Sequence, residues 1–505
     1  MDVSASLDQV KTNAKRGFTL IPLWREIPSD TLTPVSAFMK LRHEKKSPDF
    51  LLESADGGET VGRYSFLGVE PFASISEEEG DLVFKNFETG ITEKTELSWK
   101  NIESYLYQWS APKYKELPPF IGGAVGYISF DAISLIEKIK LPKKGLENKI
   151  VDLKIYRSVV VFDRLKHRAY IVSHLCIKTD GIDGGYKKAT AQIENLYQRL
   201  ISNSYTPNFL TQTSPKLILE ANDHLSSQAL MGEDDFCYAV KHIKSHIKRG
   251  DVFQCVLSDR FKFPLTADPL TIYRTLRMIN PSPYLFYLTL SEGENLLGSS
   301  PEMLVRCQDN LIETCPIAGT RPRGQTIKQD EIYEQALLAS VKEKAEHLML
   351  VDLSRNDIGR VAIPGSVNVK RFMQTERFSH VMHLVSLVTG KLKRSTSAWQ
   401  ALGSCFPAGT LSGAPKIRAM ELISNYEKEK RGVYGGAIVA VDFTGNLNSC
   451  ITIRSLYTKN GYGYAQAGAG IVADSRPAKE YEEIVNKSKA IKTAIHIASS
   501  FNGGI

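Results

Sequence analysis

The sequence predicts an α+β protein built on large β-sheets. Short apolar runs bounded by turn residues, such as 120–129 and 159–162, are typical of strands. Apolar residues at helical spacing occur in both halves of the chain, as in 187–201 and 329–350. Because strands and helices do not alternate in a regular βαβα series, we favour α+β over a doubly wound fold.

The expected elements follow one another along the chain. Strands dominate the first 200 residues, which close with the helix over 187–201. The second part opens with a helix that ends near Gly250. It continues with a strand over 252–257, a long amphipathic helix over 329–350, strands over 433–442 and 450–457, a glycine-rich strand end at 468–470 and a final helix over 479–494.

A polar segment divides the chain. Residues 202–215 (SNSYTPNFLTQTSP) are rich in Ser, Thr, Asn and Pro, which is typical of a linker. We therefore predict an N-terminal part, residues 1–205, and a C-terminal part, residues 216–505. A chain of 505 residues is long enough for one large domain or two closely joined ones.

Composition indicates a globular protein that acts on a small molecule. Hydrophobic residues at 42% and charged residues at 24% exclude a mainly disordered or fibrous chain. The net charge of +7 is spread without a basic tract, so we expect no nucleic-acid partner, whereas an anionic substrate would fit.

The cellular location is inferred from the targeting and membrane-spanning segments that the sequence lacks. No apolar run approaches the ~20 residues of a transmembrane helix, and residues 1–17 do not resemble a signal or transit peptide, so we expect no membrane. Seven scattered cysteines without a C-x-x-C pair indicate a reducing compartment rather than a zinc site. We therefore expect a cytoplasmic protein.

Two pairs of carboxylates share helix faces. Glu343 and Glu346 are three residues apart in the predicted long helix, and so are Glu480 and Glu483 in the final helix, one turn before Lys487. Such pairs are usually solvated. The apolar run after Glu346 and the glycine-rich strand before Glu480 instead favour buried helices that bring carboxylates together. Because Mg²⁺ prefers carboxylate oxygens and keeps positions open for ligands, the two helices could hold one Mg²⁺.

Four further features have both a structural and a functional reading. The small residues Gly468, Ala469 and Gly470 could present backbone N–H groups to an oxyanion or could serve packing. Arg454, on a predicted strand, could bind an anion or form an internal ion pair. His383, among apolar residues, could shuttle a proton or be a hydrogen-bonded core residue. Glu302 could be an acid with a raised pKa or a carboxylate at a helix N-terminus.

Taken together, these segments resemble the chorismate-utilising enzymes, and most closely the component I family of anthranilate synthases. The order and spacing hold from about residue 240 to 490. The matching runs are RGDVFQCVLS (249–258), NPSPYLF (280–286), PIAGT (316–320), AEHLMLVDLSRND (345–357), FSHVMHL (378–384), FPAGTLSGAPK (406–416), VYGG (433–436) and QAGAG (466–470). The resemblance implies two large packed sheets, antiparallel or mixed, flanked by helices.

The same resemblance implies roles for individual residues. Glu346 and Glu483 would bind Mg²⁺, supported by Glu343 and Glu480. Glu302 would protonate a departing hydroxyl, His383 would assist pyruvate elimination, and Thr410 would lie close to the reacting ring. Chorismate would be held by Gly319, Thr320, Tyr434, Arg454, Gly468, Ala469, Gly470 and Lys487.

Two positions distinguish branches of the family. Isochorismate- and salicylate-forming relatives carry a water-activating lysine where this chain has Gln254, and aminodeoxychorismate synthases often carry a lysine where it has Ala318. The resemblance therefore implies addition of ammonia to chorismate and release of pyruvate, giving anthranilate for tryptophan synthesis. The alternatives are an aminodeoxychorismate synthase of the folate route and a non-catalytic tryptophan-binding regulator. Retention of Glu302, His383 and the helix carboxylates argues against the regulator.

The first part of the chain adds a regulatory expectation. Residues 50–54 (FLLES) and 63–66 (RYSF) resemble the tryptophan-binding segment of feedback-inhibited members. The implied inhibitor pocket contains Glu53, Ser54, Pro283, Tyr284, Leu285 and Cys450. Leu285 replaces the methionine common in bacterial members, which bears on the strength of inhibition. The chain shows no glutaminase module, so we expect a separate glutamine amidotransferase subunit, in a heterotetramer.

Overall fold

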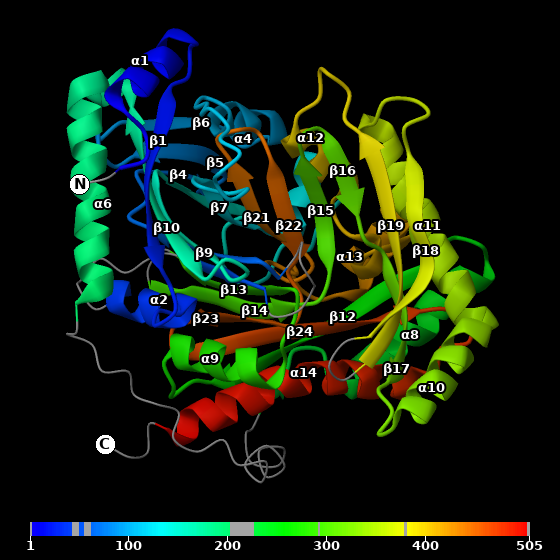
Figure 1. Ribbon diagram of the computed structural model, residues 1–505. Helices are drawn as coiled ribbons and strands as arrows, with labels where there is room; N and C mark the ends of the chain where they lie inside the picture. Colours follow the sequence, from blue (N-terminus) through cyan, green and yellow to red (C-terminus); the bar gives the residue numbers. More distant parts are fainter. Residues whose placement is uncertain are drawn as a thin grey trace.

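Two large antiparallel sheets, with helices on their outer faces, make up the protein (Figure 1). The computed structural model describes residues 3–42, 50–54, 62–202, 227–290, 293–377 and 381–501. The sheets pack against each other: the ring of Phe50, from the first sheet, meets that of Tyr156, from the second, edge-on with centroids 4.8 Å apart. The predicted α+β class with two packed sheets is confirmed.

The first sheet, sheet A, is formed by twelve strands within the described ranges. Its order is β1 (Leu20–Pro28), β10 (Arg168–Cys176), β9 (Ser158–Asp163), β3 (Tyr64–Val69), β2 (Phe50–Glu53), β13 (Tyr284–Thr289), β14 (Asn295–Ser300), β23 (Ser455–Lys459), β24 (Tyr462–Ile471), β12 (Gln254–Pro264) and β11 (Gln228–Ala229), with β20 (Gly413–Ala414) beside β12. Strand β9 is buried at every position because both faces of the sheet are covered there.

The second sheet, sheet B, likewise has twelve strands in the described part of the chain. Its order is β17 (Ile317–Pro322), β19 (Val381–Lys391), β16 (Leu311–Thr314), β15 (Met303–Gln308), β22 (Leu447–Ile451), β21 (Ala437–Asp442), β7 (Gly123–Ile128), β8 (Val151–Tyr156), β4 (Ala73–Glu78), β5 (Asp81–Asn86) and β6 (Thr92–Glu96), with β18 (Asn368–Arg377) beside β19.

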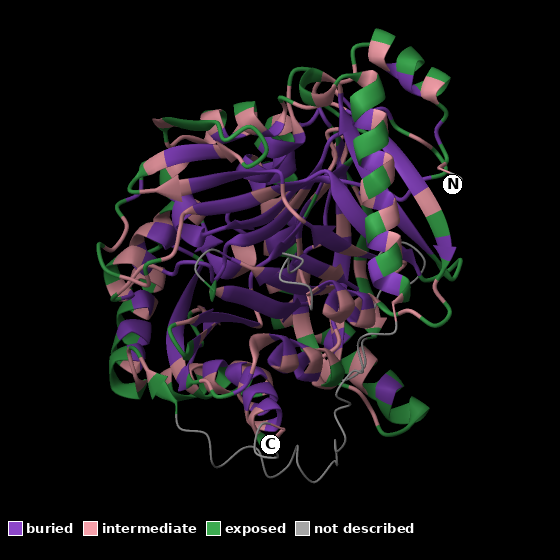
Figure 2. Ribbon diagram, turned by 90° about the vertical axis from the view of Figure 1, so that its left-hand side faces the viewer, coloured by how far each residue is buried: buried purple, intermediate pink, exposed green. Residues whose placement is uncertain are grey.

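Amphipathic helices cover the sheets. In Figure 2 the long helix α6 (Ile182–Ile201), packed on β10, shows an exposed outer stripe and a buried inner one. Helix α14 (Pro477–Ser500) runs along β24 beside α9 (Pro269–Ile279) and α8 (Glu233–Lys248) (Figure 1). The remaining helices are α1 (Leu7–Lys15), α2 (Pro34–Arg42), α4 (Trp99–Leu106), α5 (Ile177–Asp180), α10 (Ile327–Ala339), α11 (Val341–Val361), α12 (Ala398–Cys405) and α13 (Lys416–Tyr426), with 3₁₀ turns η1 (Phe130–Leu135) and η3 (Gly409–Leu411).

Strands from both predicted parts of the chain share each sheet. Strand β2 pairs with β13 in sheet A, and β7 pairs with β21 in sheet B. The proposed division at residues 205–216 lies outside the described residues, and the two-part organisation stays a prediction. The two parts are joined by continuous backbone hydrogen bonding rather than by a contact between separate sheets.

The prediction of one long helix over 329–350 was wrong. Helix α10 ends at Ala339 and α11 begins at Val341, with Ser340 between them in an extended conformation (φ −70°, ψ 112°). The Ser340 hydroxyl accepts a hydrogen bond from the Glu343 N–H (3.3 Å), so this serine starts a new helix.

A single strand over 450–457 was also wrong. Strand β22 ends at Ile451 in sheet B, and β23 begins at Ser455 in sheet A. Arg454 lies between them with a left-handed φ of 51°, which ends one strand and redirects the chain. This arginine therefore occupies a crossover between sheets, not a strand interior.

Candidate active site

The candidate site lies where the chain crosses between the sheets at two adjacent places. Strand β14 leads to β15 through Glu302, and β22 leads to β23 through Arg454. The crossovers are hydrogen-bonded together: the Ile451 N–H donates to the Glu302 carbonyl (3.1 Å), and the Ser299 N–H donates to the Arg454 carbonyl (3.1 Å). The backbone segments that carry Glu302 and Arg454 are thereby held together, and Glu302 lies between two strands rather than on a helix.

Glu302 has the properties of a general acid. Burial raises the pKa of its carboxyl group to about 7, against the opposing effects of a hydrogen bond from Thr410 and the charge of Lys487. The Thr410 hydroxyl, on η3, donates to Glu302 Oε1 at 2.9 Å. A carboxyl group with a pKa near 7 is partly protonated at neutral pH and can give its proton to a leaving group.

His383 is arranged as a neutral base. Its Nδ1 donates to the Gly319 carbonyl (2.8 Å) and lies 3.1 Å from the Thr320 hydroxyl. Because a carbonyl can only accept, the proton is on Nδ1 and the lone pair is on Nε2. Burial lowers the pKa of the imidazole, and the charge of Arg454 lowers it further. The ring is therefore neutral and able to accept a proton at Nε2.

Gly319 must be glycine for this contact to exist. Its φ of 66° is in the left-handed region. A Cβ there would lie 2.9 Å from Leu337 Cδ1 and 3.1 Å from Glu343 Oε2. The glycine thus lets β17 turn its carbonyl toward His383 while passing close to the first carboxylate of α11.

The carboxylates of α11 and α14 lie close enough for their charges to interact. The pKa of Glu346 is raised by burial and by the charges of Glu343 on its own helix and Glu483 on α14. The pKa of Glu480 is raised by burial and by Glu483. Among the described residues no group of three or more His, Cys, Asp or Glu is close enough to enclose a metal ion. One or two carboxylates suffice for Mg²⁺, which takes its other ligands from water and substrate.

Two cations lie between these carboxylates and the glycine-rich strand. Lys487 Nζ is 2.7 Å from Glu483 Oε1 and donates to the Gly468 carbonyl at 2.8 Å. Arg454 donates to the Lys487 carbonyl (2.7 Å), and burial lowers the pKa of its guanidinium. Positive charge beside the backbone of this strand favours a carboxylate ligand.

The glycine-rich run, residues 466–470, borders the candidate site. Gly468 pairs with Ser258 of β12, and a Cβ at Gly468 would lie 2.9 Å from the Tyr434 hydroxyl. Burial raises the pKa of Tyr434, so its hydroxyl stays protonated. Ala469 is completely buried in the core, so it can offer only its backbone. The side chain of Gln254 faces the run, because a Cβ at Gly470 would lie 2.4 Å from its Nε2.

The structure pairs Glu302 with Thr410 and His383 with Thr320, and the charge of Lys487 influences both Glu302 and Glu346. Sequence reasoning missed Arg321, which pairs with Glu343 at 3.2 Å. It lies in the run TRPRG (320–324), which looks like an ordinary solvated loop.

A separate cavity of about 160 Å³ lies between the sheets. It could hold a small organic molecule, since one water needs only roughly 10–15 Å³. All six residues of the predicted inhibitor pocket line it: Glu53, Ser54, Pro283, Tyr284, Leu285 and Cys450. Tyr64 and Phe66, from the RYSF run, line it too. Glu53 accepts a hydrogen bond from Tyr273 (2.8 Å).

Comparison with known proteins identifies the family. The family model described as "chorismate binding enzyme" matches residues 47–493. Anthranilate synthase component 1 of Acetivibrio thermocellus is 42% identical over 497 residues, covering 98% of each chain. The chain belongs to the chorismate-binding enzymes of the anthranilate synthase component 1 family. The Bacillus subtilis member is 42% identical over 501 residues, covering 95% of this chain and 92% of its own.

Solved structures of chorismate-binding enzymes share the fold. Anthranilate synthase component I from Streptococcus pneumoniae superimposes with a TM-score of 0.73 at 34% identity, covering 92% of this chain and 99% of that chain. The isochorismate synthase MenF of Escherichia coli gives a TM-score of 0.69 at 18% identity, covering 97% of this chain and 100% of its own. That second likeness concerns the fold alone.

Proposed function

We propose that this chain is the large subunit of anthranilate synthase, a lyase that converts chorismate and ammonia to anthranilate, pyruvate and water. The observation that carries the proposal is the position of Lys487. This one cation influences the pKa values of Glu302 and Glu346 and donates to the Gly468 carbonyl. Lys487 therefore lies near the proposed acid, the backbone of Gly468 and the helix carboxylates.

In the first step ammonia adds to the ring and the ring hydroxyl leaves. Protonated Glu302 gives its proton to that hydroxyl, which departs as water, and the added nitrogen loses a proton. Arg454, Lys487 and the backbone of 468–470 hold the substrate carboxylates. Gln254 and Ala318 have no amine, so ammonia itself is the nucleophile in this proposal.

In the second step pyruvate leaves and the ring becomes aromatic. Neutral His383 accepts the ring proton at Nε2, while the carbon–oxygen bond to the enolpyruvyl group breaks and that group takes up a proton as pyruvate. The Gly319 carbonyl, 2.8 Å from Nδ1, stabilises the imidazolium that forms. Thr320 and Thr410 border the reacting ring.

The helix carboxylates are the proposed ligands of Mg²⁺. Glu346 and Glu483 would hold it, with Glu343 and Glu480 in support, because charge repulsion and burial leave Glu346 with a raised pKa that a divalent cation would relieve. The ion would supply positive charge for a substrate carboxylate.

The cavity between the sheets would bind tryptophan as feedback inhibitor. Glu53 would receive the amino group, and Ser54 a further polar contact. Cys450 lines this cavity, while the next residue, Ile451, donates its N–H to Glu302 and accepts a hydrogen bond from Ser300 (2.7 Å). Inhibitor and acid are therefore connected through adjacent backbone, which can couple the two sites.

A separate glutamine amidotransferase subunit would supply ammonia, in a heterotetramer.

The cytoplasm is the proposed location: all seven cysteines are free, and none of the helices in the described ranges is long and apolar enough to span a membrane.

Product analysis tests the proposal. The purified chain is incubated with chorismate, Mg²⁺ and ammonium sulfate at mildly alkaline pH, and products are followed by fluorescence and by pyruvate release. Equal amounts of fluorescent anthranilate and pyruvate are expected. Accumulation of a non-aromatic aminated product without pyruvate would indicate an aminodeoxychorismate synthase, and no turnover would indicate a non-catalytic protein.

A further inference from the structure

A buried ion pair outside the candidate site connects the segments that form it. Glu427 follows α13, and Arg431 lies in the loop before β21; their side chains are 5% and 1% exposed. The pairing is bidentate, with Arg431 Nε donating to Glu427 Oε2 at 2.8 Å and Nη2 donating to Oε1 at 2.7 Å. An ion pair this deeply enclosed is costly to desolvate, so further hydrogen bonds must stabilise it.

Those further bonds come from the backbone of the site. Arg431 Nη1 donates to the Leu411 carbonyl (2.5 Å), at the end of η3 and next to Thr410. Its Nη2 also donates to the Val256 carbonyl of β12 (2.8 Å). The Arg431 guanidinium thus connects the turn η3, which carries Thr410, to β12, the strand paired with the glycine run.

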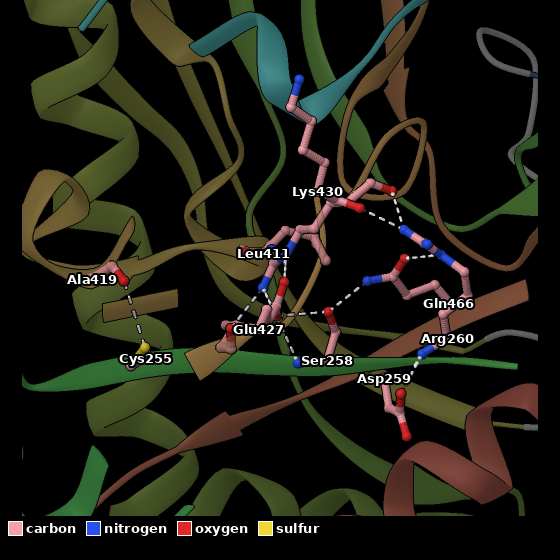
Figure 3. Close-up of polar contacts among 11 residues, drawn as sticks. Cys255, Ser258, Asp259, Arg260, Leu411, Ala419, Glu427, Lys430 and Gln466 are labelled. Atoms are coloured by element: carbon pink, nitrogen blue, oxygen red, sulfur yellow. Dashed lines mark hydrogen bonds and ion pairs between the residues drawn. The ribbon is translucent and has the colours of Figure 1, made fainter. Parts of the chain in front are cut away.

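The carboxylate binds the same strand. Glu427 Oε1 accepts hydrogen bonds from both the N–H (2.9 Å) and the hydroxyl (2.8 Å) of Ser258. Ser258 is the residue opposite Gly468, and its hydroxyl also accepts from Gln466 (2.8 Å). Figure 3 shows these contacts running from Leu411 through Glu427 and Ser258 to Gln466.

Two aromatic side chains, Tyr434 and Phe130, also pack against this pair. The Arg431 guanidinium carbon lies 5.8 Å from the ring centroid of Tyr434 and 4.5 Å from that of Phe130. Such cation–π contacts are favourable when the cation is desolvated. The pair therefore contacts the turn that carries Thr410, the strand opposite the glycine run and Tyr434.

We propose that Glu427 and Arg431 are positioning residues that fix the distance between the Thr410–Glu302 acid and the anion-binding glycine strand. The inference rests on the proposed function and assigns the pair no contact with substrate. Arginine is required because its planar fork reaches Glu427, Leu411 and Val256 together, whereas a lysine ammonium keeps the charge but not this geometry.

Arg431→Lys tests the proposal with a matched control. Arg157 is also buried, pairs with Asp180 (3.2 Å) and Glu88, and lies 5.0 Å from the Phe72 ring. It directly precedes β9, which five strands of sheet A separate from β24. Arg157→Lys should lower the Tm with little change in kcat. Arg431→Lys should reduce kcat for anthranilate formation at least tenfold at a temperature where both variants are folded, with the KM for chorismate changed less than threefold. Equal kcat values in the two variants would overturn the proposal.

Epistasis shows whether Arg431 acts through Thr410. Weakening the hydrogen bond from Thr410 should raise the pKa of Glu302, because the charge of Lys487 is then the main effect left to lower it. Arg431→Lys should therefore move the alkaline limb of the kcat profile upward. In a Thr410→Val background that shift should vanish; a full additional shift would contradict the positioning role. An infrared titration of the Glu302 carboxyl, assigned with Glu302→Gln, measures the shift of the same pKa without turnover.

A second variant keeps the test decisive if Arg431→Lys does not fold. Ser258→Ala removes one hydroxyl from the network and no charge, and it should lower kcat at least threefold with a KM for chorismate within twofold. Unchanged kcat in Ser258→Ala would overturn the proposal. Failure of the proposed function is distinguishable, because wild-type enzyme would then make no anthranilate while the infrared shift would still report on the pair.

Discussion

The Thr410 hydroxyl donates a hydrogen bond of 2.9 Å to Glu302 Oε1. This bond stabilises the ionised carboxylate and so lowers a pKa that burial alone would raise further. The acid strength of Glu302 is therefore set by a balance between an enclosed position and one hydroxyl group.

Thr410→Val should move the alkaline limb of the pH profile upward. Without the hydroxyl, the pKa of Glu302 rises above about 7, so the protonated acid persists to higher pH. A shift of about one pH unit is expected, because a hydrogen bond to a charged group contributes about 1.5 kcal/mol. The measurement is kcat against pH at constant free ammonia. Thr410→Ser, which keeps the hydroxyl, should retain the wild-type profile, and a downward shift in Thr410→Val would refute the assignment.

Glu346→Gln and Glu483→Gln should each weaken Mg²⁺ binding at least about tenfold and abolish turnover. Glu346→Gln also removes a charge that Glu343 and Glu483 repel, so the metal-free variant should have a higher Tm than wild type. Calorimetric titration with Mg²⁺ and thermal melts with chelator check both effects. Glu331→Gln, on the exposed face of α10, is the control and should change neither value. Full activity of wild type after exhaustive chelation would exclude the metal role.

His383→Ala should separate the two steps. If the imidazole serves ring deprotonation, the variant should still aminate chorismate and accumulate the aminated compound that retains its pyruvyl group. Chromatography of quenched reactions measures this compound against anthranilate. His242→Ala, on the exposed face of α8, should show wild-type product ratios. Equal loss of both steps would make His383 a packing or binding residue.

Ser54→Phe should abolish inhibition by tryptophan while ammonia-dependent activity stays close to wild type. The phenyl ring would occupy the 160 Å³ cavity and leave the polar groups of the inhibitor unpaired. Titration with tryptophan at matched chorismate should show at least a tenfold rise in the half-inhibitory concentration, and Ser54→Ala a smaller one. Reduced activity and Tm with unchanged inhibition would mean that Ser54 only ends a strand. Linkage also requires saturating chorismate to weaken tryptophan binding in the wild type.

Periodicity predicted the fold well where elements are long and continuous. The final helix and the helix over 187–201 appear as α14 and α6, since one face of each is buried along most of its length. Periodicity did not show the break at Ser340, because the apolar spacing on both sides is helical. The sequence Ser340–Glu343 fits the S-x-x-E pattern of a helix start, which could have revealed the break.

The crossover at Arg454 was beyond sequence reasoning. The run CITIRSLY (450–457) is rich in apolar and β-branched residues, as one strand would be, and arginine has no special preference for a left-handed backbone. The candidate site residues follow from the family resemblance, whose motifs have a recognisable order and spacing, and their roles stay predictions. Glu427 and Arg431 were missed because in the run EKEKRG (427–432) they look like charges on a solvated loop, and only the packed structure shows them enclosed.

The sharing of both sheets by distant segments has a consequence for how the protein is made. When residue 202 leaves the ribosome, β2 and β7 are complete but their neighbours β13 and β21 have not been synthesised. Pairings so far apart in sequence form slowly, and unpaired strand edges attract other chains. Either half expressed alone should therefore aggregate, and productive folding must wait until nearly the whole polypeptide has been translated.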